Sequence, residues 1–147
     1  MRFLIFDRFR AEDPDVVVAN CTEPCIWITI NDPGEKTHRI SFRSGMIKDH
    51  LSLSFYDVED VDGEGIWKNQ AKLVCEFVKK NIEQHHIGLI CCACEAGVSR
   101  SAATALALHR ILNPLDTSDL DINPNHGKYP NQAVLHTIIS EWKRLGF

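Results

Sequence analysis

Four stretches of the chain have the hydrophobic pattern of strands, namely residues 2–7, 25–30, 50–55 and 87–93. The first two (RFLIFD and CIWITI) are short runs rich in β-branched and aromatic residues, and the third (HLSLSF) alternates polar with apolar positions. The fourth (IGLICCA) is apolar throughout, which is typical of a central strand covered by helices on both faces. The segment that begins at Pro14 suits either a short helix or a strand.

Three further stretches have helical spacing. Residues 101–112 are strong helix formers, and residues 131–145 are amphipathic. Residues 66–81 place one apolar stripe on a helix that Asn81 is expected to end, and the stripe comprises Ile66, Trp67, Ala71, Val74, Cys75 and Val78. Strands that alternate with helices predict one α/β domain over residues 1–147, with a central, mostly parallel sheet flanked by helices.

Composition and charge exclude several classes of function. The 147 residues are 44% hydrophobic and 24% charged, a globular balance, and the net charge of −4 argues against bulk attraction to nucleic acid or anionic membranes. No apolar run reaches the ~18 residues of a membrane span, and the N-terminus becomes charged too early for a signal peptide. Six cysteines without such a leader predict free thiols in a cytoplasmic protein. The oligomeric state stays open.

The segment CEAGVSR, from Cys94 to Arg100, separates the apolar run from the alanine-rich helix. A tight loop before a helix N-terminus can direct several backbone N–H groups at one anion, and Gly97 lets the backbone fold tightly. Arg100 can hold two phosphate oxygens at once. These positive surroundings would stabilise a nucleophilic thiolate at Cys94, and Ser101 could donate a hydrogen bond to its sulfur.

The sequence CEAGVSRS resembles the Cys-x5-Arg-Ser/Thr loop of the cysteine-dependent protein tyrosine phosphatases, most of all their dual-specificity-like subgroup. The segments WITINDPGE, LSLSFYDVED and YPNQAVLHTI are similar to those of small bacterial and phage phosphatase-like proteins, from about Trp27 onward. The resemblance implies a phosphate-binding loop between strand and helix, and metal-independent hydrolysis without a cofactor through a phosphocysteine at Cys94. It implies that these loop residues bind substrate: Glu95, Ala96, Gly97, Val98, Ser99 and Arg100.

The resemblance also implies a general acid in the acidic loop after the third strand. Asp57 fits best because it closes the pattern L-x-L-x-F-x-D that the family shows before its acid. Asp60 could reach a similar place if the loop curls. Asp62 precedes a glycine and is more typical of a turn.

One position departs from the family pattern. The family usually has a histidine immediately before the nucleophile, where it orders the loop, and this chain has Ala93. We therefore expect an active but slower phosphatase. The alternative is a pseudophosphatase that binds phosphorylated partners without turnover, and a sulfurtransferase is a more distant third.

The loop contains no lysine, which makes highly charged inositol phosphates less suitable as substrates. The sequence favours a protein phosphorylated on tyrosine or on serine and threonine, or a small aryl phosphate. No nucleic acid or membrane partner is expected.

Other polar and aromatic residues have plainer interpretations. Cys91 and Cys92 are expected in the core, with a disulfide to Cys94 after oxidation as a weaker alternative. The spacing of Cys21 and Cys25 with the CCAC run does not make a convincing metal site, so none is predicted.

The remaining expectations are solvated histidines at 85 and 86, core positions for Trp67 and Trp142, and a capping or site-flanking role for Tyr129 and Asn131.

Overall fold

The computed structural model describes residues 1–59, 65–120 and 129–147. Within these ranges four strands form one sheet, in the order β1 (Arg2–Phe6), β4 (Leu89–Ala93), β2 (Cys25–Asn31) and β3 (Ile47–Ser54). All neighbouring strands are parallel. The predicted α/β class with a parallel sheet is confirmed, and β4 has the central place that its apolar run indicated.

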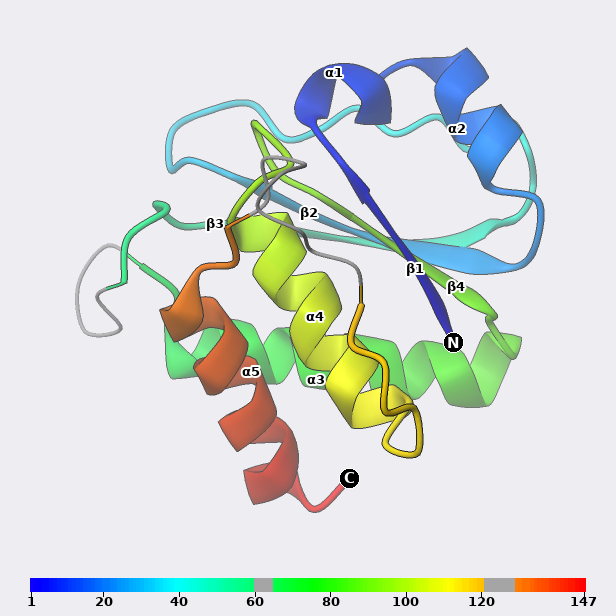
Figure 1. Cartoon of the computed structure of the whole chain (residues 1–147). Coiled ribbons are helices and arrows are strands. Elements are labelled where there is room, and N and C mark those ends of the chain that lie inside the picture. Colours follow the sequence, from blue (N-terminus) through cyan, green and yellow to red (C-terminus); the bar gives the residue numbers. More distant parts are fainter. Residues whose placement is uncertain (60–64, 121–128) are drawn as a thin grey trace.

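Helices cover both faces of the sheet (Figure 1). The short helices α1 (Arg8–Ala11) and α2 (Pro14–Asn20) pack on one face, in a core cluster built around Trp27. The longer helices α3 (Lys68–His85), α4 (Arg100–Leu112) and α5 (Gln132–Leu145) pack on the other face, in a larger cluster that includes Ile28 and Ile90. Burial on both faces explains why β2 and β4 have no alternation of polar and apolar residues.

The segment after Pro14 is a helix, not a strand. Asp13 is its N-cap and accepts a hydrogen bond from the backbone N–H of Asp15, while proline occupies the first turn. Proline is favoured there because the first N–H groups of a helix have no partner within the helix. The N-cap therefore decides between the helix and the strand that the sequence of this segment allowed.

Two expectations for α3 are wrong. Asn81 does not end the helix, because its buried side chain donates to the carbonyl of Phe77 and to Asp49, and the helix continues to His85. Trp67 is not a core residue, since it is the N-cap and 49% exposed. The other five residues of the predicted stripe are buried as expected.

All six cysteines are free thiols, and Cys91 and Cys92 are fully buried, as predicted. No helix within the described ranges is long and apolar enough to cross a membrane. Over the same residues, no group of three or more His, Cys, Asp or Glu side chains is arranged to hold a metal ion.

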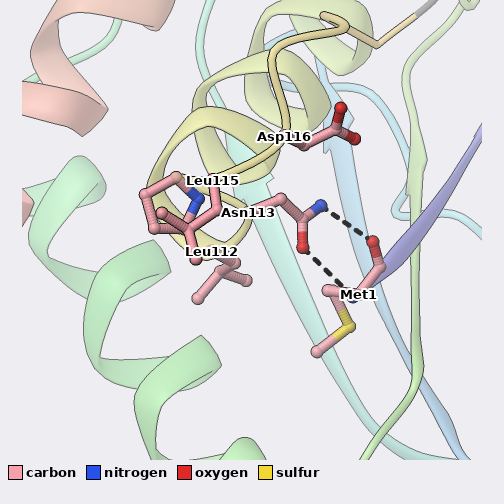
Figure 2. A pocket seen from close by; sticks show the side chains of 6 residues that line it. Met1, Leu112, Asn113, Leu115 and Asp116 are labelled. Carbon is pink, nitrogen blue, oxygen red and sulfur yellow. Dashed lines mark hydrogen bonds between the residues drawn. The ribbon is translucent and has the colours of Figure 1, made fainter.

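A pocket of about 450 Å³ lies at the carboxyl end of α4, where Met1 and Asn113 exchange two hydrogen bonds (Figure 2). The 13 residues of α4 separate it from the Cys94–Arg100 loop by about 20 Å. This pocket is therefore distinct from the loop on which the sequence concentrates its chemistry.

We predict that Ile28→Ala lowers the free energy of unfolding by about 2–5 kcal/mol, because Ile28 is fully buried in the central part of the sheet and its truncation leaves a cavity. Urea unfolding followed by circular dichroism measures this. Leu73→Ala is the control, since Leu73 on α3 is 49% exposed and should change stability by less than about 0.5 kcal/mol. Equal effects of the two substitutions would contradict the assigned core.

Candidate active site

Cys94 is the first residue after β4, and its side chain lies next to the first turn of α4. Its thiol is nearly inaccessible, with 2% of the residue exposed, and its backbone N–H donates to the carbonyl of Phe6 at 3.4 Å. The Cys94 sulfur lies 3.1 Å from the hydroxyl oxygen of Ser101 in the first turn of the helix. The structure thus brings together the two side chains that the sequence analysis paired as nucleophile and hydrogen-bond donor.

The carbonyl groups of the loop are held by elements outside it. The carbonyl of Glu95 accepts from the N–H of Arg8 at 3.1 Å, and that of Val98 accepts from the N–H of Tyr129 at 2.9 Å. A trans peptide is planar, with its C=O and N–H pointing in opposite directions. Carbonyls that are bound from outside therefore turn the N–H groups of Ala96 and Ser99 toward the interior of the loop, where they can bind an anion.

Gly97 lets the loop lie against the junction of β1 and α1. Its φ is +66°, a conformation that side chains disfavour, and a Cβ atom there would lie 2.7 Å from the backbone nitrogen of Asp7. The same Cβ would lie 2.8 Å from the carbonyl carbon of Phe6. Both backbone freedom and close approach thus require glycine.

Arg100 is buried, with 5% of the residue exposed, and one end of its guanidinium is fixed. Its Nη1 donates to the carboxylate of Asp32 at 2.7 Å and to the carbonyl of Phe55 at 2.6 Å. Its Nε is buried and has no hydrogen-bond partner among the described residues. An unpaired buried donor is costly, typically about 1–3 kcal/mol, so this atom marks a position where a bound acceptor would be stabilised.

The N-terminus of α4 has no side-chain cap. Ser99 stands at the N-cap, but its hydroxyl donates to the carboxylate of Asp57 at 2.8 Å. The same carboxylate oxygen accepts from the amide of Asn131 at 2.9 Å. Uncapped N–H groups and the helix dipole favour an anion at this end of the helix.

Asn131 connects the start of α5 to the Asp57 segment at this edge. Its side-chain oxygen accepts from the N–H of Val134 and caps α5, and its side-chain nitrogen donates to Asp57. Capping and flanking of the loop were alternatives in the sequence, and the structure shows both. Asp60 and Asp62, the other candidate acids, lie outside the described residues.

The remaining thiols have surroundings unlike that of Cys94. Burial raises the pKa of Cys75 to about 12 and raises that of Cys92 strongly. Cys21, Cys25 and Cys91 lie in the other core cluster, where hydrogen bonds from Cys25 and Cys91 lower the pKa of Cys21. These three thiols lie among apolar side chains, and in the part of the chain that the structure describes no hydrogen bond or ion pair joins one of them to an arginine or a lysine.

The sequence analysis missed two residues that support this site. Asp32 comes directly after β2 and pairs with Arg100, and Arg8 comes just after β1 and pairs with Glu95 at 2.8 Å. Both residues come just after strands that the sequence predicts, and the carboxyl ends of parallel strands meet at one edge of a sheet. Their place at this edge could therefore have been predicted. The pairing itself depends on which strands are neighbours.

Comparisons with solved structures identify the fold. Over 98% of its length the chain is similar to human tyrosine phosphatase-like serine/threonine/tyrosine-interacting protein, with a TM-score of 0.64, 17% identity and 92% of that chain covered. It is similar to the Yvh1 phosphatase domain from Chaetomium thermophilum (TM-score 0.62, 17% identity, 98% and 91% covered). It is likewise similar to human DUSP28 (TM-score 0.61, 11% identity, 98% and 93% covered). No protein-family model and no curated protein matches the sequence.

At sequence identities of 11–17%, these similarities establish the fold alone, and the chemistry of the site has to be argued from its residues. The fold is that of the dual-specificity-like tyrosine phosphatases, as the resemblance of the loop implied. The similarity spans nearly the whole chain, including the segments before Trp27 that carried no sequence resemblance.

We predict that Gly97→Ala disrupts the loop, lowering both stability and anion binding, because the new Cβ would meet the backbone of Phe6 and Asp7. Gly45→Ala is the matched control. Gly45 also has a positive φ, +72°, but a Cβ there has no atom within 4 Å, so this variant retains backbone strain without the clash.

Thermal unfolding, with and without inorganic phosphate, measures the difference. Gly97→Ala should have a lower melting temperature than Gly45→Ala and should lose the stabilisation by phosphate that the control retains. Similar melting temperatures and similar phosphate effects would show that the loop does not depend on this close approach.

Proposed function

From the phosphatase fold and the geometry of its loop, we propose that this protein is a phosphomonoester hydrolase that acts through a phosphocysteine intermediate at Cys94 without a metal ion. The observation that carries the proposal is the unpaired, buried Nε of Arg100 in a loop whose amides point inward. Because Nη1 is already bonded to Asp32 and Phe55, a phosphate would take the Nε and Nη2 edge.

In the first step, the Cys94 thiolate attacks phosphorus in line with the ester oxygen. A bond forms between sulfur and phosphorus, and the bond from phosphorus to the ester oxygen breaks. Arg100 and the loop amides stabilise the charge on the three equatorial oxygens. Asp57 gives its proton to the leaving oxygen.

In the second step, Asp57 takes a proton from water as the water attacks the phosphocysteine. The sulfur leaves as a thiolate, inorganic phosphate forms, and the Asp57 proton is restored for the next cycle. Ser101, at 3.1 Å, donates a hydrogen bond to the leaving sulfur and so favours this step.

The charges around the loop support a substrate with a single phosphate. Among the described residues, the loop itself carries one guanidinium, that of Arg100, while the guanidinium of Arg8 is held by Glu95 and Glu12. Tyr129 is 61% exposed and its backbone binds Val98, so an aromatic side chain borders the loop. We therefore propose an aryl phosphate or a phosphorylated protein as substrate.

We predict that the protein hydrolyses para-nitrophenyl phosphate in the presence of EDTA and that Cys94→Ser abolishes turnover, because a serine hydroxyl at this position has no adjacent base. Absorbance of nitrophenolate measures the rate under reducing conditions. Cys75→Ala is the control, since this thiol is buried in the core and should be dispensable for chemistry.

Phosphate binding separates this function from its alternative. If the wild type does not turn over but inorganic phosphate still stabilises it, the protein is a phosphate-binding module, and Ala93 is the first residue to replace by histidine. Absence of both turnover and phosphate binding would refute the proposal.

We predict that Asp57→Asn lowers kcat for phenyl phosphate by about 10²–10⁴-fold and for para-nitrophenyl phosphate by much less, because nitrophenolate needs little protonation to leave. Steady-state kinetics on both esters measure the two ratios. Asparagine keeps the acceptor oxygen that Ser99 and Asn131 contact. Asp116→Asn, on an exposed loop, is the control. Equal small losses on both esters would exclude Asp57 as the acid.

A further inference from the structure

His38 is a buried histidine with no assigned role. It lies in the segment between β2 and β3, it is 4% exposed, and neither of its ring nitrogens has a hydrogen-bond partner among the described residues. A buried imidazole without partners is unfavourable, so its presence requires an explanation.

The backbone on both sides of His38 is clamped to the start of α1. The carbonyl of Thr37 accepts from Nη2 of Arg8 at 3.1 Å, and the N–H of Arg39 donates to the carboxylate of Glu12 at 3.0 Å. Arg8 and Glu12 are themselves paired at 2.8 Å, and Arg8 also holds Glu95 of the loop through its backbone and its side chain. One arginine thus joins the His38 segment to the residue after Cys94.

His38 lies close to the Cys94–Arg100 loop, because Arg8 binds both the carbonyl of Thr37 and the side chain of Glu95. Burial lowers the pKa of His38, so the ring is neutral at neutral pH, while the backbone of Cys94 acts in the opposite direction. An interaction that raises the pKa of a histidine is one with an acceptor, which identifies the group as the carbonyl of Cys94. The charged and titratable groups around the ring are Arg8, Glu12, Glu95 and His50.

We propose that His38 is a positioning residue of the loop, donating a ring N–H to the carbonyl of Cys94 when the loop binds phosphate. The carbonyls of Glu95 and Val98 are already held from outside by Arg8 and Tyr129. The peptide between Cys94 and Glu95 is trans and planar, so fixing its carbonyl toward His38 turns the N–H of Glu95 toward the bound anion.

This role rests on the proposed function of the loop and adds a residue to it. Histidine is absent at position 93, next to the nucleophile in the chain, and His38 reaches the same backbone from another segment. In this proposal His38, which lies outside the Cys94–Arg100 loop, orders the loop.

Substitutions at position 38 separate hydrogen bonding from packing. His38→Leu fills a similar volume without a donor, whereas His38→Asn and His38→Gln each retain an N–H at the position of one ring nitrogen. We expect His38→Leu to lower kcat for para-nitrophenyl phosphate by about 10–100-fold, the size of effect that a displaced catalytic loop produces. One of the two amides should restore most of this loss. His136→Leu, at an exposed position on α5, is the control.

Rescue is the outcome that a purely structural role does not produce. If all three variants lose the same activity in proportion to their melting temperatures, or if His38→Leu keeps full activity, His38 does not position the loop.

A second measurement does not depend on turnover. The ring ¹⁵N resonances of His38, observed by NMR in the Cys94→Ser variant, should show a neutral ring below pH 6.5, and addition of inorganic phosphate should shift the donor nitrogen. A ring that is already protonated at pH 6.5, or that does not respond when the loop amides respond to phosphate, would overturn the proposal. Absence of any phosphate response from the loop amides would instead overturn the proposed function.

Discussion

The close contact between the Cys94–Arg100 loop and the junction of β1 and α1 is the constraint on which the site depends. Gly97 fits there because it has no Cβ, and Arg8 binds the carbonyl of Glu95 from the same junction. Loop carbonyls held from outside leave their N–H partners facing inward. The anion site that we propose is built from backbone amides and needs no cluster of lysines, which agrees with the net charge of −4.

The parallel sheet brings the polar groups together. Phe6, Asp32, Phe55 and Cys94 all lie at or just beyond the carboxyl ends of strands, so segments far apart in the sequence meet at one edge. Asp32 and the carbonyl of Phe55 fix one end of the Arg100 guanidinium, and its Nε has no hydrogen-bond partner in the part of the chain that the structure describes. The arrangement is preorganised, since its donors are oriented before an anion binds.

The sequence analysis selected the Cys94–Arg100 loop as the candidate site because its chemistry is contiguous. A buried apolar strand, a glycine-containing turn, one arginine and a run of helix formers are all local features. They were sufficient to predict the α/β class and to select Cys94, Arg100 and Ser101 as candidates. Local features were less reliable at α3. Trp67 and Asn81 were misjudged because a helix N-cap tolerates an exposed aromatic and because a buried asparagine is stable when it is hydrogen-bonded.

The sequence by itself determined the α/β class with a mostly parallel sheet and selected the candidate residues of the Cys94–Arg100 loop, because periodicity and spacing act within a few residues of one another. The tertiary structure alone decided that Asp32 pairs with Arg100, that Arg8 supports Glu95 and that Arg8 also binds the segment of His38. The first two contacts join residues that are 68 and 87 positions apart in the sequence. Such pairs depend on the strand order β1-β4-β2-β3, which no local pattern encodes.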